Sequence, residues 1–171
     1  MQRIVVLGPG GAGKSSLAVT LGTARGLPVV ELDRHFWSAD LEPLTPERWW
    51  AVQTELAAGD TWIMDGDLGP YDVLAPRLAR ADTVIVLDLS PWRCAGRALR
   101  RSPLWRLDFW RWLLTWRRRY RPLVLRAVAE HAPTADLLVL RTPSQVDDLI
   151  TRSGGRPGPP ASGGRGRRSS R

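Results

Sequence analysis

The sequence predicts an α/β domain in which one parallel, five-stranded sheet is covered by helices on both faces. Two observations carry this prediction. Short, continuous apolar runs recur along the chain, and they alternate with longer segments of helical periodicity, which is the pattern of parallel strands buried on both sides. The expected strands are residues 3–7, 28–32, 61–65, 83–88 and 136–141.

Helices are expected between these strands. Thr45 followed by Pro46 has the residue types favoured at a helix N-cap and first turn, and Ser90 followed by Pro91 repeats the pattern. In the long amphipathic segment near the C-terminus, Pro122 lacks the backbone N–H that a helix interior uses, so we expect a break there. The expected helices are residues 14–25, 46–58, 91–101, 108–130 and 143–152.

Length and composition limit the class of protein. The 171 residues suit one domain with a substantial core, and 43% of them are hydrophobic. No apolar run approaches the ~20 residues of a membrane span, and no signal pattern opens the chain. Cys94 is the only cysteine, which excludes a disulfide framework and favours a small core residue on a helix. We expect a soluble, cytoplasmic protein with no membrane partner.

The positive charge is concentrated in two segments. The formal net charge is +8, yet residues 1–92 contain 7 basic and 12 acidic side chains. Residues 93–126 contain eleven arginines and one acid, and residues 153–171 contain five arginines and no acid. The last segment is otherwise mostly Gly, Pro and Ser, so we expect a disordered basic tail at 153–171 after a folded domain at 1–152.

The segment Gly8-Pro-Gly-Gly-Ala-Gly-Lys-Ser15 fits the pattern G-x-x-x-x-G-K-[ST] of a P-loop and lies between an expected strand and an expected helix. Among the 25 basic residues Lys14 is the only lysine, at the one position where a flexible point charge follows the β- and γ-phosphates. The Ser15 hydroxyl is a candidate Mg²⁺ ligand. The loop residues expected to bind nucleotide are Gly8, Gly10, Gly11, Ala12, Gly13, Lys14, Ser15 and Ser16.

Aspartates follow three of the expected strands. Ligands of an open parallel sheet bind beyond the carboxyl ends of its strands. Asp33 and Asp65 are therefore candidates to position an acceptor hydroxyl or a magnesium-bound water. Asp88 is more typical of a cap or a structural hydrogen bond, and Asp67 either faces the acceptor or forms a turn.

Other P-loop classes fit less well. A GTPase needs an Asn/Thr-Lys-x-Asp motif, but this chain has no asparagine and a single lysine. The Leu-Ser-Gly-Gly signature of transporters is absent, and the domain is small for a motor or a helicase. The small-molecule kinases remain, in which an arginine-rich lid closes over the triphosphate. Residues 93–126 are the expected lid region.

Five segments together resemble a known family. Over roughly residues 1–150 the chain is similar to adenylate-kinase-related proteins called DNA topology modulation proteins. The resemblance implies an adenylate-kinase-like P-loop core, ATP as the phosphoryl donor and a substrate that is poorly defined for the family. The segments are residues 8–16, 31–37, 62–69, 81–88 and 140–143.

The resemblance also assigns residues. Asp65 matches the aspartate that organises magnesium-bound water in nucleoside monophosphate kinases, which adds Asp65 to Ser15 at the metal site. Arg97 and Arg101 match a pair that contacts ATP and the transferring phosphate. An Arg-x-Asp…Arg spacing after the lid assigns Arg106 and Arg117 to the nucleotide. The catalytic set is then Lys14, Asp33, Asp65, Arg97 and Arg101.

The chain departs from nucleoside monophosphate kinases in two ways. Those enzymes follow Asp-Gly with Phe-Pro-Arg, whose arginine holds the acceptor phosphate, whereas this chain continues with Asp67-Leu-Gly-Pro70. The lid between Arg101 and Asp108 is only a few residues long. Both departures leave the acceptor open between a nucleoside monophosphate-like molecule and another hydroxyl or phosphate acceptor.

The arginines and tryptophans each have two interpretations. The arginine block either stabilises the negative charge of a phosphoryl group during its transfer or forms a solvated basic face. We expect two to four of its members to contact phosphate. The nine tryptophans either pack, as the spacing of Trp112 and Trp116 indicates, or stack on a ring near Trp37, Trp49 and Trp50. His35 and His131 are not spaced for a metal site.

The sequence thus predicts an ATP- and Mg²⁺-dependent kinase that acts on a small-molecule acceptor. The alternative is a nucleotide-dependent, nucleic-acid-associated or regulatory protein with slow ATP hydrolysis. In that case the arginine block, with its interleaved aromatic residues, and the basic tail contact phosphate backbones.

Overall fold

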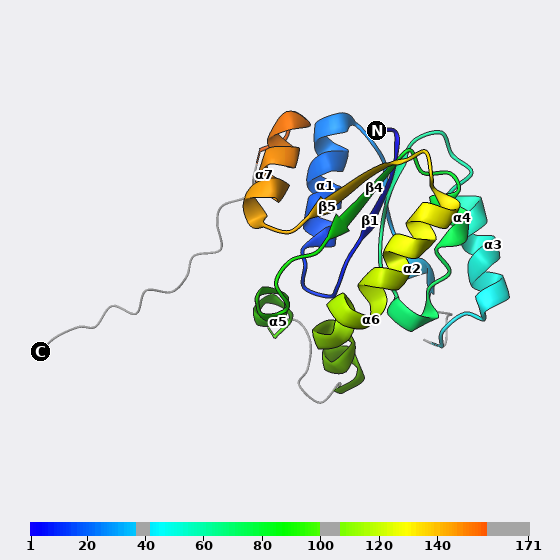
Figure 1. The fold of residues 1–171 in the computed structure, drawn as a ribbon. Coiled ribbons are helices and arrows are strands. Elements are labelled where there is room, and N and C mark those ends of the chain that lie inside the picture. Colours follow the sequence, from blue (N-terminus) through cyan, green and yellow to red (C-terminus); the bar gives the residue numbers. More distant parts are fainter. Residues whose placement is uncertain (37–41, 100–106, 157–171) are drawn as a thin grey trace, which may run out of the picture.

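The computed structural model describes residues 1–36, 42–99 and 107–156. Its five strands are all parallel and lie in the order β2-β3-β1-β4-β5, which confirms the predicted P-loop fold class (Figure 1). Each strand begins and ends within one residue of its expected position. The strands are β1 (Arg3–Leu7), β2 (Val29–Glu31), β3 (Trp62–Asp65), β4 (Thr83–Leu87) and β5 (Asp136–Leu140).

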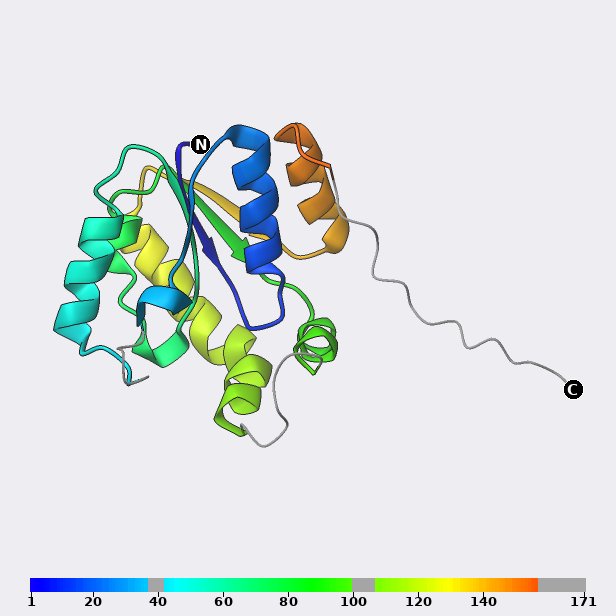
Figure 2. The ribbon, with the colours of Figure 1, turned by 180° about the vertical axis from the view of Figure 1, so that it is seen from behind.

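Helices cover both faces of the sheet, so alternate residues of β1 enter two separate cores. Ile4 and Val6 pack on the side of α1 (Lys14–Arg25) and α7 (Pro143–Arg152). Val5 and Leu7 pack on the side of α3 (Pro46–Leu56), α4 (Ala75–Leu78) and α6 (Leu107–His131). Figures 1 and 2 show these two layers from opposite sides. Because both faces are covered, β1 and β4 are apolar after their first residues, Arg3 and Thr83.

The strand register brings the candidate residues to one edge of the sheet. Val6 of β1 lies opposite Asp65 of β3, and Leu7 lies opposite Val86 of β4. The P-loop after β1, the end of β3 and the end of β4 are therefore neighbours. This is the carboxyl edge, where parallel sheets bind ligands.

The predicted helix starts are confirmed in part. The Thr45 side chain accepts from Arg48 N at 3.4 Å at the start of α3, and Thr142 with Gln145 forms a capping box at the start of α7. The predicted start of α5 (Pro91–Ala98) is also confirmed, with Ser90 at the N-cap, although the Ser90 side chain makes no capping hydrogen bond with the described residues. Pro91 at the first position of α5 leaves one fewer N–H to cap.

The predicted break at Pro122 was wrong. The helix α6 runs through Pro122 without interruption over 25 residues. Pro122 lies on the exposed side, whereas Trp116 before it and Val124 and Val128 after it are buried in one core. These anchors on both sides keep the helix together, although proline costs it one hydrogen bond.

Three short elements were not predicted. They are α2 (Asp33–Phe36), the 3₁₀ helix η1 (Gly69–Tyr71) and α4. Elements of three or four residues carry no periodicity for the sequence to display. They follow β2 and β3, so they shape the carboxyl edge.

Cys94 is a buried core residue on α5, as predicted. No helix in the described part of the chain is both long and apolar enough to cross a membrane. Most of the expected tail at 153–171 lies outside the described residues.

Candidate active site

The P-loop has a backbone that only glycine adopts readily at several positions. Gly8, Gly11 and Gly13 have φ values of 143°, 73° and 95°. A Cβ added at Gly8 would lie 2.7 Å from the Leu87 carbonyl oxygen, so a side chain there would clash with β4. The loop is closed by a hydrogen bond of 3.2 Å from Ala12 N to Pro9 O. The glycines of the motif are thus required by the geometry of the loop.

Lys14 is the first residue of α1, and its side chain folds back over the P-loop. Its Nζ donates to Gly8 O at 2.9 Å and to Pro9 O at 3.3 Å. Ser15 and Ser16 follow in the first turn, with exposed side chains. The N-cap of α1 is Gly13, which has no side chain to cap the first N–H groups. A cation and the positive end of a helix therefore meet at one loop, which is a favourable arrangement for phosphate.

Asp65 ends β3 beside this loop and is 5% exposed. Its Oδ1 has no hydrogen-bond partner among the described residues. Burial raises the pKa of the carboxyl, and the Ser15 hydroxyl and the Lys14 charge oppose that rise. The two predicted metal ligands, Ser15 and Asp65, are therefore brought together with one carboxylate oxygen unused.

Asp33 was expected at the end of a strand but is the first residue of the short helix α2. Its side chain is exposed, yet the protein around it excludes enough water to raise the pKa of its carboxyl. The charge of Lys14 lowers that pKa, whereas Asp72 and Glu31 raise it further. Asp33 is thus within electrostatic reach of the P-loop lysine.

Asp67 forms a turn, one of its two predicted roles, and it also ties three elements together. Its Oδ1 accepts from Gly69 N at 3.0 Å. Its Oδ2 accepts from Gly8 N at 3.3 Å and from Trp116 Nε1 at 3.0 Å. Burial raises the pKa of this carboxyl. Asp67 therefore connects the P-loop and α6 to the turn after β3.

A buried network that sequence reasoning missed supports this turn. Arg77 is completely buried and makes a bidentate ion pair with Asp72, at 2.9 Å and 2.7 Å. The same guanidinium donates to Gly66 O at 3.2 Å and to the Gln53 side chain. Although burial alone raises the pKa of Asp72, the charge and hydrogen bonds of Arg77 hold it below the ordinary value. The only sequence signal was Gln53, four residues after Trp49 on the buried side of α3.

The predicted arginines have separate surroundings. Arg97 Nη1 donates to Ala12 O at 3.4 Å, which places this side chain against the P-loop. Arg117 Nε donates to Asp88 Oδ1 at 2.7 Å, and Arg121 lies 3.0 Å from the other oxygen of Asp88. Asp88 thus makes the structural contact expected of it. Arg101 and Arg106 lie outside the described residues.

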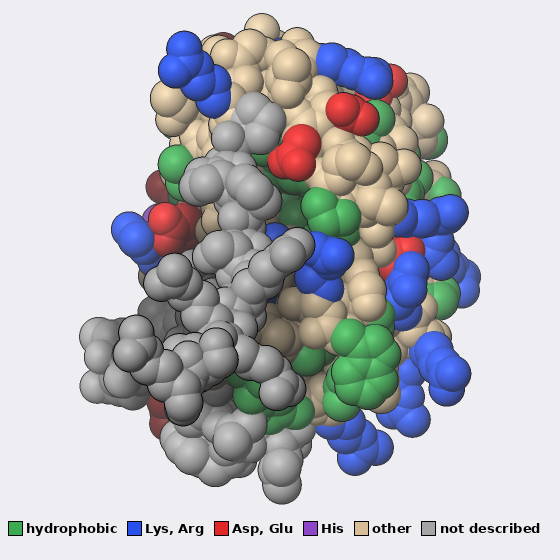
Figure 3. Space-filling view, turned by 90° about the vertical axis from the view of Figure 1, so that its left-hand side faces the viewer, with side chains coloured by type: hydrophobic (Ala, Val, Ile, Leu, Met, Phe, Trp, Pro, Cys, Tyr) green, Lys and Arg blue, Asp and Glu red, His purple; other side chains and the backbone are tan. Residues whose placement is uncertain are grey.

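The remaining described arginines of the 93–126 block are exposed: Arg93, Arg111, Arg118, Arg119 and Arg126. Figure 3 shows basic side chains gathered along one border of the face that it presents. A solvated basic face is therefore the better interpretation for this part of the block.

The tryptophans largely pack. Trp49 and Trp116 are completely buried, and Trp49 Nε1 donates to Asp72 at 3.4 Å. The prediction that Trp49 could stack on a ligand was wrong, because its ring fills the core against Phe36. Trp50 is half exposed, and Trp37 lies outside the described residues.

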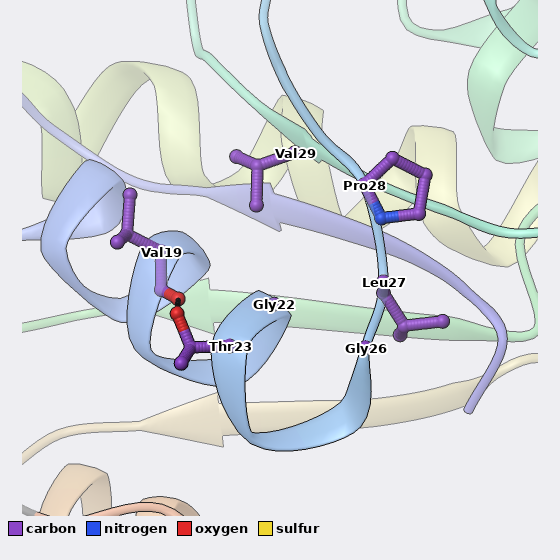
Figure 4. Close-up of a pocket in the computed structure, with 7 residues that line it drawn as sticks. All are labelled: Val19, Gly22, Thr23, Gly26, Leu27, Pro28 and Val29. Carbon is purple, nitrogen blue, oxygen red and sulfur yellow. Dashed lines mark hydrogen bonds between the residues drawn. The ribbon is translucent and has the colours of Figure 1, made fainter.

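Hollows in the described structure include two that differ in their linings. One lies between the end of α1 and β2 (Figure 4), where no lining residue is ionisable and the Thr23 hydroxyl donates to Val19 O of its own helix at 2.9 Å. The other, of about 580 Å³, begins at Asp67 and Gly69 and runs between α4 and the second half of α6 to His131. No group of three or more His, Cys, Asp or Glu side chains that could hold a metal occurs in residues 1–36, 42–99 and 107–156.

Comparisons with known proteins support the fold. No family model matches the chain, and no curated protein sequence matches it. Solved structures do match. A shikimate kinase from Acinetobacter baumannii in complex with shikimate is 17% identical, with a TM-score of 0.58 and coverage of 89% of this chain and 90% of that chain.

Two other kinases match to a similar degree. A gluconokinase from Sinorhizobium meliloti 1021 is 16% identical, with a TM-score of 0.56 and coverage of 90% and 89%. A deoxyadenosine kinase from M. mycoides with bound dATP is 13% identical, with a TM-score of 0.52 and coverage of 87% and 97%. These matches show that the chain has the fold of P-loop kinases, and they do not confirm the DNA topology modulation family.

Proposed function

We propose that the protein is an ATP-dependent small-molecule kinase. The observation that carries the proposal is the meeting of Lys14, Ser15 and the partly unpaired Asp65 at one edge of a P-loop kinase fold. The glycine loop and the N-terminus of α1 hold the phosphates of ATP, and Lys14 leaves the carbonyls of Gly8 and Pro9 to follow the γ-phosphoryl group. Positioning and charge stabilisation of this kind are most of what phosphoryl transfer needs.

The residues at this edge fit a magnesium ion. Mg²⁺ takes oxygen ligands, keeps several waters and is usually held by one or two carboxylates together with substrate phosphates. The Ser15 hydroxyl and the free Oδ1 of Asp65 supply such oxygens. When bound, the ion neutralises developing charge on the phosphates. Burial raises the pKa of Asp65, which means that its ionised form is disfavoured. A cation bound nearby offsets that cost.

The acceptor side is formed by the segments after β2 and β3. Asp33, at the start of α2, orients the acceptor, since it lies within electrostatic reach of Lys14. Arg97 reaches the transfer point from α5, where it already touches the loop. Arg101, Arg106 and Arg117 are assigned to the nucleotide by resemblance, and for Arg117 this requires release from Asp88.

The test is ATP-to-ADP turnover with Mg²⁺ across nucleoside monophosphates, nucleosides, sugars and sugar acids. We expect one acceptor to raise turnover far above the rate with ATP alone, and Lys14→Ala to abolish that rise. The exposed Arg25→Ala variant, on the same helix, is the matched control that keeps activity.

The opposite result is also informative. If no acceptor raises turnover and only slow, Lys14-dependent hydrolysis is seen, the kinase proposal fails. Binding of single-stranded nucleic acid by the arginine block and tail is then the alternative to measure.

A further inference from the structure

Two tryptophans one turn apart on α6 differ in how their indole N–H groups are used. Trp116 Nε1 donates to Asp67 at 3.0 Å. Trp112 Nε1 is buried and has no acceptor among the described residues. A buried donor without an acceptor reduces the stability of the folded state, so its presence calls for a reason.

Trp112 lies between the loops that follow β1 and β3. A Cβ added at Gly10 of the P-loop would be 3.2 Å from its Cζ3 atom. A Cβ added at Gly69 would be 2.5 Å from its Nε1 atom. The benzene part of the indole therefore faces the P-loop, and its donor atom faces the turn after β3. Because β1 and β3 are adjacent strands, this is the space between donor and acceptor substrates at the carboxyl edge.

Packing accounts for the ring of Trp112 but not for its N–H group. The ring contacts the rings of Phe109, at 5.9 Å between centroids, and Tyr120, at 6.5 Å. A phenylalanine would make such contacts and leave no donor unpaired. Asp67, the carboxylate that accepts from Trp116 on the same helix, has its two oxygens occupied by Gly8, Gly69 and Trp116.

We propose that Trp112 is a substrate-contacting residue whose indole N–H donates to an oxygen of the phosphoryl acceptor. The inference rests on the proposed kinase function and narrows its acceptor to molecules that place a hydroxyl, carboxylate or phosphate oxygen beside Gly69. In the ligand-free chain Nε1 is buried against the turn at Gly69. The acceptor therefore separates the indole from this turn when it binds. A site built to pair a substrate oxygen discriminates strongly against analogues that lack it.

The test compares two variants in which a single ring replaces the two fused rings of the indole. Trp112→His keeps a ring N–H donor when assayed at pH 8, where a histidine of ordinary pKa is neutral, and Trp112→Phe has none. With the acceptor that the wild type uses, we expect Trp112→Phe to raise its KM about 10- to 100-fold and Trp112→His to recover part of the loss. The KM for ATP should change by the same factor in both, because both variants lose the part of the indole that faces the P-loop.

A second measurement needs no substrate. The melting temperature should fall less in Trp112→Phe than in Trp116→Phe, because only the second substitution removes a paired N–H group and takes from Asp67 one of its three donors. Equal acceptor KM values for Trp112→Phe and Trp112→His would overturn the inference while leaving the kinase proposal intact. An equal or larger melting loss in Trp112→Phe would overturn it as well, since the N–H group would then have a partner within the protein. A wild type with no acceptor-dependent turnover would overturn both proposals.

Discussion

Two groups of polar side chains lie around the turn that follows β3, and they differ in how completely they are paired. Arg77 and Asp72 are buried and bonded to each other, to Gln53 and to the backbone of Gly66, and of the Arg77 nitrogens only Nε lacks a partner among the described residues. Asp65 and Trp112 lie at the carboxyl edge. Each has one buried polar atom, Oδ1 of Asp65 and Nε1 of Trp112, with no hydrogen-bond partner among the described residues.

This difference separates support from substrate binding. The paired network fixes the backbone of residues 66–72, and Asp67 carries that order to Gly8 and α6. The unpaired atoms lie where phosphates, a metal ion or an acceptor can supply the missing hydrogen bond or metal contact. A buried polar group is costly when left alone, so the edge is less stable without its ligands than with them.

The largest effect is expected from a substitution that breaks the paired network. Arg77→Leu removes one partner of a buried ion pair and leaves the Asp72 carboxylate without its counter-charge, so we expect a loss of about 3–5 kcal/mol in the free energy of unfolding. Arg80→Leu, three residues on, is the control, because the Arg80 side chain is exposed and donates to Ala58 O at 3.2 Å. Urea unfolding measures the free energy of unfolding of both variants. Similar losses in the two would show that the buried network around Arg77 does not stabilise the fold more than an exposed arginine does.

A smaller effect, of opposite sign, is expected at the edge. The folded-state pKa of Asp65 is raised above 3.8, so this group favours folding below that pH and loses the contribution as pH rises through its folded pKa. Asp65→Asn should therefore stabilise the ligand-free protein by about 1 kcal/mol near pH 7, with the gain vanishing towards pH 4.

Asp72→Asn is the matched variant. The pKa of Asp72 is lowered below 3.8, so its contribution is present at neutral pH and is lost as pH falls through the folded value. Asp72→Asn should destabilise the protein at pH 7. Unfolding at several pH values separates the two, and a destabilised Asp65→Asn protein at pH 7 would place Asp65 in the paired network.

The smallest effect is expected at the start of α7, outside the residues assigned to substrates. Thr142→Ala removes the capping box of α7 and should cost about 1 kcal/mol. Because no residue assigned to ATP, Mg²⁺ or the acceptor lies on α7, ATP turnover should stay unchanged at a temperature where the variant is folded. Lower turnover with full folding would mean that the edge depends on the whole domain, which would weaken the separation of support from binding.

The sequence predicted the sheet well because its signals are local. Apolar runs mark β1, β3 and β4, and Thr142-Pro143 marks the start of α7. The P-loop was also predictable, since its glycines and Lys14 stand in one short segment whose geometry requires them.

The rest depends on contacts between distant segments. Arg77 resembles any other arginine in a chain that has almost no lysine, and its partners Gln53 and Asp72 lie on other elements. The break expected at Pro122 failed because buried residues on both sides of it, which a local rule ignores, hold α6 together. The roles of Asp67 and Trp112 likewise depend on α6 lying across the ends of β1 and β3.

Binding of ATP with and without Mg²⁺, measured by calorimetry for the wild type and Asp65→Asn, tests the central claim most directly. Asp65 should act as a ligand-binding group and not as support. The account predicts that the variant is folded and at least as stable as the wild type, yet loses most of the Mg²⁺-dependent gain in ATP affinity. An unchanged Mg²⁺ dependence would contradict the account.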